Sequence, residues 1–149
     1  MTRFADVTGK PVLSRDSAEQ LGHVGGIAIA LDPPRVTSLV VKVGRKTGVV
    51  SRADVTSFGP DAVIVGSDGA WHEPATDDDE RAVSGRGVPV GKRVLTEGGD
   101  ELGAVADGEF DPHDGALVAL FAQDRPLDAR RLLGLGSYAL VVSSEGLRH

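Results

Sequence analysis

The chain has 149 residues, of which 40% are hydrophobic, 26% are charged and only 4% are aromatic, and its net charge is −6. This composition is typical of a globular protein with an aliphatic core, made of one ordinary domain or two very small ones. The absence of cysteine excludes disulfides, thiolate nucleophiles and cysteine-type zinc sites, and the acidic balance disfavours non-specific binding to DNA.

The first half of the chain predicts a series of short strands. They lie near residues 10–14, 21–31, 36–43, 48–51, 55–58 and 62–66. Large and small side chains alternate along the second of them, which places Ile27, Ile29 and Leu31 on one face of a strand. Residues 44–48 predict a hairpin loop, and residues 52–54 predict a short helical turn.

Residues 71–90 have the composition of an acidic linker that contains glycine and proline. A run of four acidic residues at 77–80 is followed by glycines at 85 and 87, so we predict a solvated segment. The linker begins with Trp71, the only tryptophan. Its favoured interpretation is a plug between two packed barrels, and the alternative is a hot spot for a partner.

The second half of the chain follows the plan of the first. Strands are predicted near residues 102–106, 115–121 and 138–142, and residues 127–133 predict a brief helix because they lack β-branched side chains.

Five short matches recur in the same order in the two halves, about 80 residues apart. They pair residues 9–14 with 91–96, 21–24 with 102–105, 32–33 with 111–112, 39–40 with 117–118, and 62–65 with 139–142. We therefore predict two copies of one module, at residues 1–70 and 91–149, joined by the linker at 71–90. Because domains of this size are marginally stable alone, we expect the copies to pack together about a pseudo-two-fold axis.

The repeated pattern resembles the PRC-barrel family. It begins with Gly-Lys-x-Val-Leu, which occurs at 9–13 and again at 91–95. Leu-Gly-x-Val, a strand that ends near Asp-Pro, and Leu-Val follow in that order. The resemblance implies an all-β fold of two small β-barrels in tandem, each with a short helical turn. It also implies a non-catalytic role, since members of this family dock onto other macromolecules, including the photosynthetic reaction centre and the ribosome.

No catalytic site is predicted, and no cofactor. The four histidines, His23, His72, His113 and His149, show no zinc-protease or deaminase spacing. His113 lies in Asp-Pro-His-Asp-Gly, which is a turn sequence, with a divalent metal site as the less favoured alternative. The acidic run at 77–80 lacks the spacing of a calcium loop.

One basic cluster stands out, made of Lys42, Arg45, Lys46 and Arg52. It is interpreted as a hairpin tip that charge keeps soluble, or as a surface for RNA phosphates or an acidic protein. With Trp71 and His72, these cations are the candidate partner-binding residues.

These patterns predict a non-enzymatic binding or scaffold protein. The expected partner is a protein, with the ribosome or RNA and a second copy of the chain as alternatives. A different hypothesis places a small molecule or metal in the cleft between the barrels, near Trp71 and His72. The longest apolar runs have about five residues, so no membrane span is predicted, and we expect a cytoplasmic location.

Overall fold

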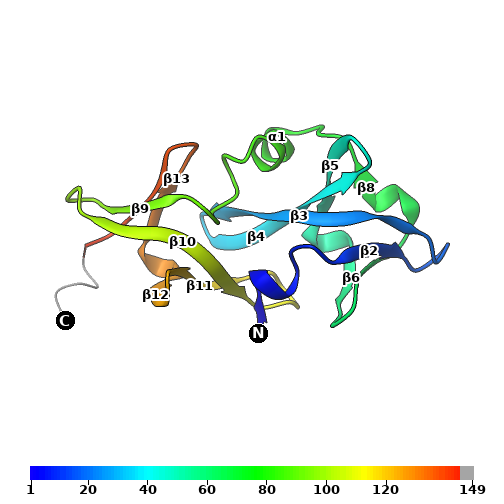
Figure 1. Ribbon diagram of the computed structural model, residues 1–149, viewed down its shortest axis with the longest axis horizontal. Helices are drawn as coiled ribbons and strands as arrows, with labels where there is room; N and C mark the ends of the chain where they lie inside the picture. Colours follow the sequence, from blue (N-terminus) through cyan, green and yellow to red (C-terminus); the bar gives the residue numbers. More distant parts are fainter. Residues whose placement is uncertain (145–149) are drawn as a thin grey trace.

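The computed structural model describes residues 1–144, and these residues form two β-sheets that lie side by side (Figure 1). The first sheet contains β2 (Pro11–Ser14), β3 (Gln20–Leu31), β4 (Pro34–Val43), β5 (Lys46–Ser51), β6 (Val55–Phe58), β7 (Val63–Val65) and β8 (Trp71–His72). The second contains β9 (Arg93–Thr96), β10 (Glu101–Phe110), β11 (Leu117–Ala122), β12 (Arg125–Asp128), β13 (Leu132–Leu135) and β14 (Ala139–Val142), with β1 (Thr2–Arg3) added beside β10. The predicted all-β class is confirmed.

The two sheets share one strand order. Six strands of the first sheet run β6-β7-β2-β3-β4-β5 and six of the second run β13-β14-β9-β10-β11-β12, so these strands correspond one to one, while β8 and β1 have no counterpart. Each sheet contains one parallel pair, in which Val12 faces Val63 and Val94 faces Leu140. A 3-10 turn follows the last strand of this order in both sheets: η2 (Arg52–Asp54) follows β5, and η4 (Ala129–Arg131) follows β12. The turn at 52–54 was predicted from the sequence.

The alternation in the first long strand correctly predicted its buried side, although bulges modify it. Ile27 and Ile29 are buried and Leu31 is half-buried. The pairing of β3 with β4 shifts between Val24 and Gly26, where Gly25 is an extra residue, so Val24 and Ile27 both reach the main core. Ala28 is buried as well, in a small separate cluster that includes Ala82.

The prediction of a solvated linker at 71–90 is wrong for much of this segment. The acidic run forms α1 (Asp77–Val83), and Thr76 and Asp79 make a capping box at its start. Thr76 Oγ1 accepts a hydrogen bond from the Asp79 N–H at 3.1 Å, and negative charges in the first turn stabilise a helix. The helix packs on the first sheet through buried Ala82, against Val40 and Val49. The boundaries of the two modules stay a prediction.

The predicted helix at 127–133 is also wrong in part. Only Ala129–Arg131 form a helical turn, while Leu127 lies in β12 and Leu132 begins β13. Leu127 and Leu132 are both buried, so their pairing within the second sheet outweighs the local helix propensity.

Three phenylalanines join the two sheets. The ring of Phe110 is fully buried, and its centroid lies 5.8 Å from that of Phe4 and 5.3 Å from that of Phe58. The N-terminal strand β1 pairs with β10, so the start of the chain lies at the junction between the sheets (Figure 1). One continuous apolar core therefore extends through both modules.

Trp71 does not serve as the plug between the barrels. It belongs to β8, pairs with Val50 of β5, and packs within the first sheet. The cluster of Phe4, Phe58 and Phe110 fills the junction between the two sheets instead.

Within residues 1–144, no helix has the length and apolar character that a membrane-spanning helix requires.

Candidate functional site

The tip of the β4–β5 hairpin carries the predicted basic residues Lys42, Arg45 and Lys46. All three are exposed, and Gly44 allows the tight turn between the strands because its φ of +59° lies in the left-handed region. Lys46 Nζ lies 3.6 Å from a carboxylate oxygen of Glu73, and both side chains are largely exposed. No ion pair holds Lys42 or Arg45 among the described residues.

Two histidines adjoin this tip. His72 of β8 is exposed, and its Nδ1 lies 2.9 Å from the carbonyl oxygen of Glu73. His23 pairs with Lys42 across β3 and β4, so it lies beside the hairpin as well. Sequence reasoning did not include His23 in the cluster, because the register between the two strands was unknown. The site that we call the basic tip consists of Lys42, Arg45, Lys46, His23 and His72.

Trp71 supports the tip but is not free to bind a partner. Its ring is half-buried, and its Nε1 donates a hydrogen bond to the Val41 carbonyl at 3.0 Å. A Cβ on Gly48 would lie only 2.6 Å from a ring carbon of Trp71, so the glycine makes room for the indole. The ring therefore fixes β8 beside the hairpin.

Arg52 lies away from the basic tip. It follows β5 at the opposite end from the hairpin, and its Nη1 donates to the His113 carbonyl at 3.4 Å. A Cβ on Gly115 would lie 2.6 Å from Arg52 Nε, so the side chain covers the turn of the second module. The structure separates Arg52 from the other three predicted cations and places it between the modules.

His113 occupies the turn expected from the sequence. Asp111 accepts a hydrogen bond from the His113 N–H, and Asp114 accepts one from the Ala116 N–H, both at 2.8 Å. These carboxylates shape the backbone in the manner of Asx turns. Within residues 1–144, no group of three or more acidic or histidine side chains is arranged to hold a metal ion, and His149 lies outside the described residues.

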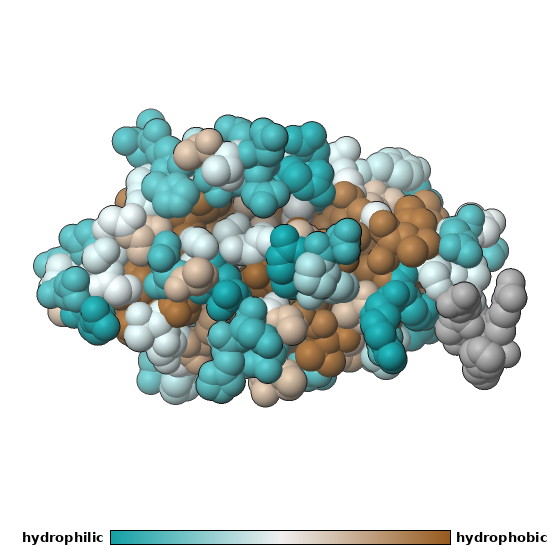
Figure 2. Space-filling model, turned by 180° about the vertical axis from the view of Figure 1, so that it is seen from behind, coloured by the Kyte–Doolittle hydropathy of each residue, from teal (hydrophilic) through white to brown (hydrophobic). Residues whose placement is uncertain are grey.

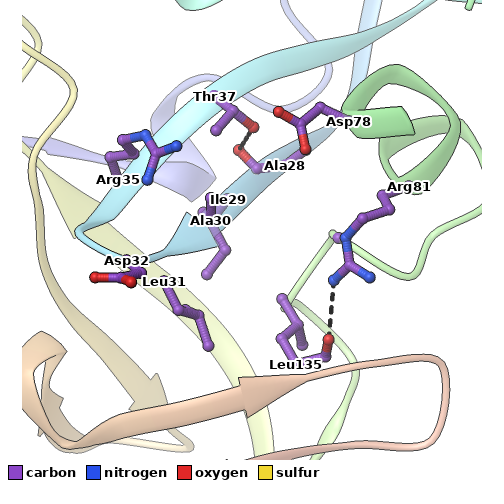
Figure 3. Close-up of a pocket in the computed structure, with 11 residues that line it drawn as sticks. Ala28, Ile29, Ala30, Leu31, Asp32, Arg35, Thr37, Asp78, Arg81 and Leu135 are labelled. Atoms are coloured by element: carbon purple, nitrogen blue, oxygen red, sulfur yellow. Dashed lines mark hydrogen bonds between the residues drawn. The ribbon is translucent and has the colours of Figure 1, made fainter. Parts of the chain in front are cut away.

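A cleft lies between the modules, but not near Trp71 and His72 as the ligand hypothesis placed it. It has a volume of about 330 Å³ and is bounded by the turn between β3 and β4, by α1 and by Leu135 of β13 (Figure 3). The far wall of this cleft comes from the second sheet, so only the tertiary structure forms it.

Lys92 secures the segment between α1 and the second sheet. Its Nζ donates to the carbonyls of Gly85 and Val88, at 2.5 and 2.9 Å. Burial, and to a lesser degree the nearby positive charge of Arg81, lowers the pKa of Lys92. Lys92 therefore holds the segment at 85–88 in place, a role that the repeated Gly-Lys motif did not predict.

The rear face of the molecule differs between its two ends. Polar side chains cover most of the first sheet there, whereas apolar side chains gather over the second (Figure 2). Around the first sheet, recognition would therefore depend more on charge and hydrogen bonding than on apolar contact.

The fold and this site define a small all-β module with a charged hairpin tip. In agreement, the family model of the PRC-barrel domain matches residues 1–71, so the first module is similar to the PRC-barrel family. The predicted family is thereby confirmed, while membership of the second module stays a prediction. No curated protein matches the chain.

Proposed function

We propose that this chain is a cytoplasmic, non-catalytic docking protein whose basic tip binds an acidic surface of a protein partner. One observation carries the proposal: three exposed cations gather at one hairpin, and only Lys46 has an ion-pair partner among the described residues. The PRC-barrel match supports the proposal, because such modules commonly bind proteins.

The charge of the whole chain makes this tip distinctive. The net charge is −6, so the chain as a whole repels an acidic partner, whereas the basic tip attracts it. Such an arrangement orients a partner and speeds association more than it raises affinity. The Lys46–Glu73 pair is exposed and therefore weak, so Lys46 can exchange Glu73 for a carboxylate of the partner.

RNA is the alternative partner, since phosphates would also meet the tip. Proteins that bind single-stranded RNA usually stack bases on aromatic rings. Trp71 is the aromatic residue beside the tip, and its ring is packed and hydrogen-bonded to Val41. This favours a protein, with a second copy of the chain as a further candidate because residues 91–149 carry ten acidic and six basic residues.

The test is a pull-down from native lysate with three baits: the wild type, R45E/K46E and R86E/R125E. The last is the matched control, because Arg86 and Arg125 are exposed, lie away from the tip and give the same change in net charge. We expect a defined partner with the wild type and the control, its loss with R45E/K46E, and weaker recovery when salt rises from about 50 to about 300 mM. Equal recovery of that partner by all three baits would exclude the basic tip as the docking site.

A further inference from the structure

The cleft between the modules has a distinctive set of charges. Arg35 and Arg81 line it and are half-buried, while Asp32 and Asp78 line it and are exposed (Figure 3). Their formal charges sum to zero. Within residues 1–144, none of the four makes an ion pair with another side chain.

Each guanidinium group is positioned by a backbone carbonyl instead of a carboxylate. Arg35 Nη1 donates to the Pro33 carbonyl at 2.8 Å, and Arg81 Nη2 donates to the Leu135 carbonyl at 2.9 Å. A guanidinium has five N–H donors, so most donors of both arginines stay available to a ligand. The two side chains enter from opposite walls, since Arg35 belongs to β4 and Arg81 to α1 (Figure 3).

The base of the cleft is apolar. Leu31 and Leu135 lie there near each other, and both are half-buried (Figure 3). Leu31 ends β3 of the first module and Leu135 ends β13 of the second, so this surface exists only when the modules are packed. Aliphatic groups of a ligand would leave water by contact with these two leucines.

We propose that this cleft binds a zwitterionic aliphatic amino acid. Its carboxylate would accept hydrogen bonds from a guanidinium of Arg35 or Arg81, its ammonium group would donate to Asp32 or Asp78, and its side chain would contact Leu31 and Leu135. A simple anion would be attracted by the arginines and repelled by the two aspartates. A simple cation would be attracted by the aspartates and repelled by the arginines. A ligand that carries both charges satisfies both signs.

The size of the cleft agrees with this class of ligand. Pockets for small molecules measure about 300–1,000 Å³, and the cleft, at about 330 Å³, lies at the small end of that range. A single amino acid therefore fits it better than a nucleotide or a larger cofactor.

The first experiment is calorimetric titration of the full chain with three molecules that share one side chain. They are leucine, 4-methylpentanoate, which lacks the ammonium group, and 3-methylbutylamine, which lacks the carboxylate. We expect leucine to bind about tenfold more tightly than either of the others, because each loses one charge-assisted contact. Equal binding of leucine and 4-methylpentanoate, or no heat with leucine up to about 10 mM, would overturn the proposal.

Variants then locate the site. R35Q and R81Q should each weaken leucine binding by about threefold to tenfold, while R86Q, at an exposed arginine outside the cleft lining, leaves it unchanged. R81Q also removes the hydrogen bond to Leu135, so R35Q provides the test if R81Q is unstable. Unchanged leucine binding by R35Q and by folded R81Q would exclude the cleft. Docking at the basic tip is independent of R35Q, so either proposal can fail alone.

Discussion

Gly108 offers the sharpest test of how the two modules are joined. It lies in β10, is buried, and faces the ring of Phe4 from the N-terminal segment. A Cβ at this position would lie 2.7 Å from two ring carbons of Phe4 and 2.9 Å from Leu120 Cδ2. These neighbours are buried in the shared core and have little room to move, so G108A should strain the junction.

The expected loss of stability follows from two opposing effects. Overpacking of a filled core costs about 1–3 kcal/mol, whereas replacing glycine by alanine restricts the unfolded chain and returns about 0.4–1 kcal/mol. The difference is a net destabilisation of about 1–2 kcal/mol. For a chain of this size, each kcal/mol lowers the Tm by about 2–4 °C, so we expect a decrease of roughly 2–8 °C.

Urea unfolding provides the measurement, with Trp71 fluorescence reporting the first module and far-ultraviolet circular dichroism reporting the whole chain. The control is G134A, which makes the same chemical change in β13, where a Cβ would meet no atom within 4 Å. We expect G108A to lower both transitions together and G134A to leave them unchanged or slightly raised. If G108A is as stable as G134A, or if the fluorescence transition does not move, the argument for a junction packed around Phe4 is wrong.

Three further predictions concern single hydrogen bonds and one carboxyl group. W71F removes the donor to the Val41 carbonyl and should lower the free energy of unfolding by about 1 kcal/mol, as measured by circular dichroism in urea. T76A removes the N-cap of α1 and should cost about 1 kcal/mol, seen as faster hydrogen exchange in that helix. Hydrogen bonds from the side chain and backbone of Arg130 lower the pKa of Asp128 to about 2. The stabilisation by the Asp128 carboxylate is therefore complete above about pH 4 and is lost as the pH falls through about 2. D128N should be the less stable protein at neutral pH, and the difference from the wild type should disappear once the pH is below about 2.

Each of these predictions has an outcome that contradicts it. A W71F variant as stable as the wild type would mean that the Val41 bond contributes nothing. Unchanged exchange in α1 of T76A would show that packing of Ala82 alone maintains the helix. A stability difference between D128N and the wild type that stays undiminished as the pH falls below about 2 would assign the effect of the substitution to something other than the charge of Asp128.

Much of the local structure was predictable because it depends on short-range pattern. Alternating side chains, β-branched residues and turn sequences predicted the strands that became β3 and β4 and the hairpin between them. The turn at Gly44, with the exposed cations Arg45 and Lys46 beside it, lies in the hairpin loop that the sequence predicted. The all-β class and the family therefore followed from the sequence.

The helix in the linker was missed although its signal was present. Thr76 followed three residues later by Asp79 is close to a capping-box pattern, and Ala82 supplies one apolar contact toward the sheet. The run of four acidic residues obscured this signal, because like charges are typical of solvated segments. At the start of a helix the same charges are favourable, since they face the positive end of its dipole.

Sequence by itself predicted the strands β2 to β7 of the first sheet, the turn between β4 and β5, and a similar plan for the second half of the chain. Only the tertiary structure decided that Phe110 contacts Phe4 and Phe58, that Arg52 covers the second module, and that Arg35 and Arg81 face one cleft. The physical reason is that a strand's own pattern fixes which of its faces is apolar, whereas the partner of that face depends on how two complete sheets pack. Side chains far apart in the chain meet only after that packing, so no local pattern specifies the site that they build.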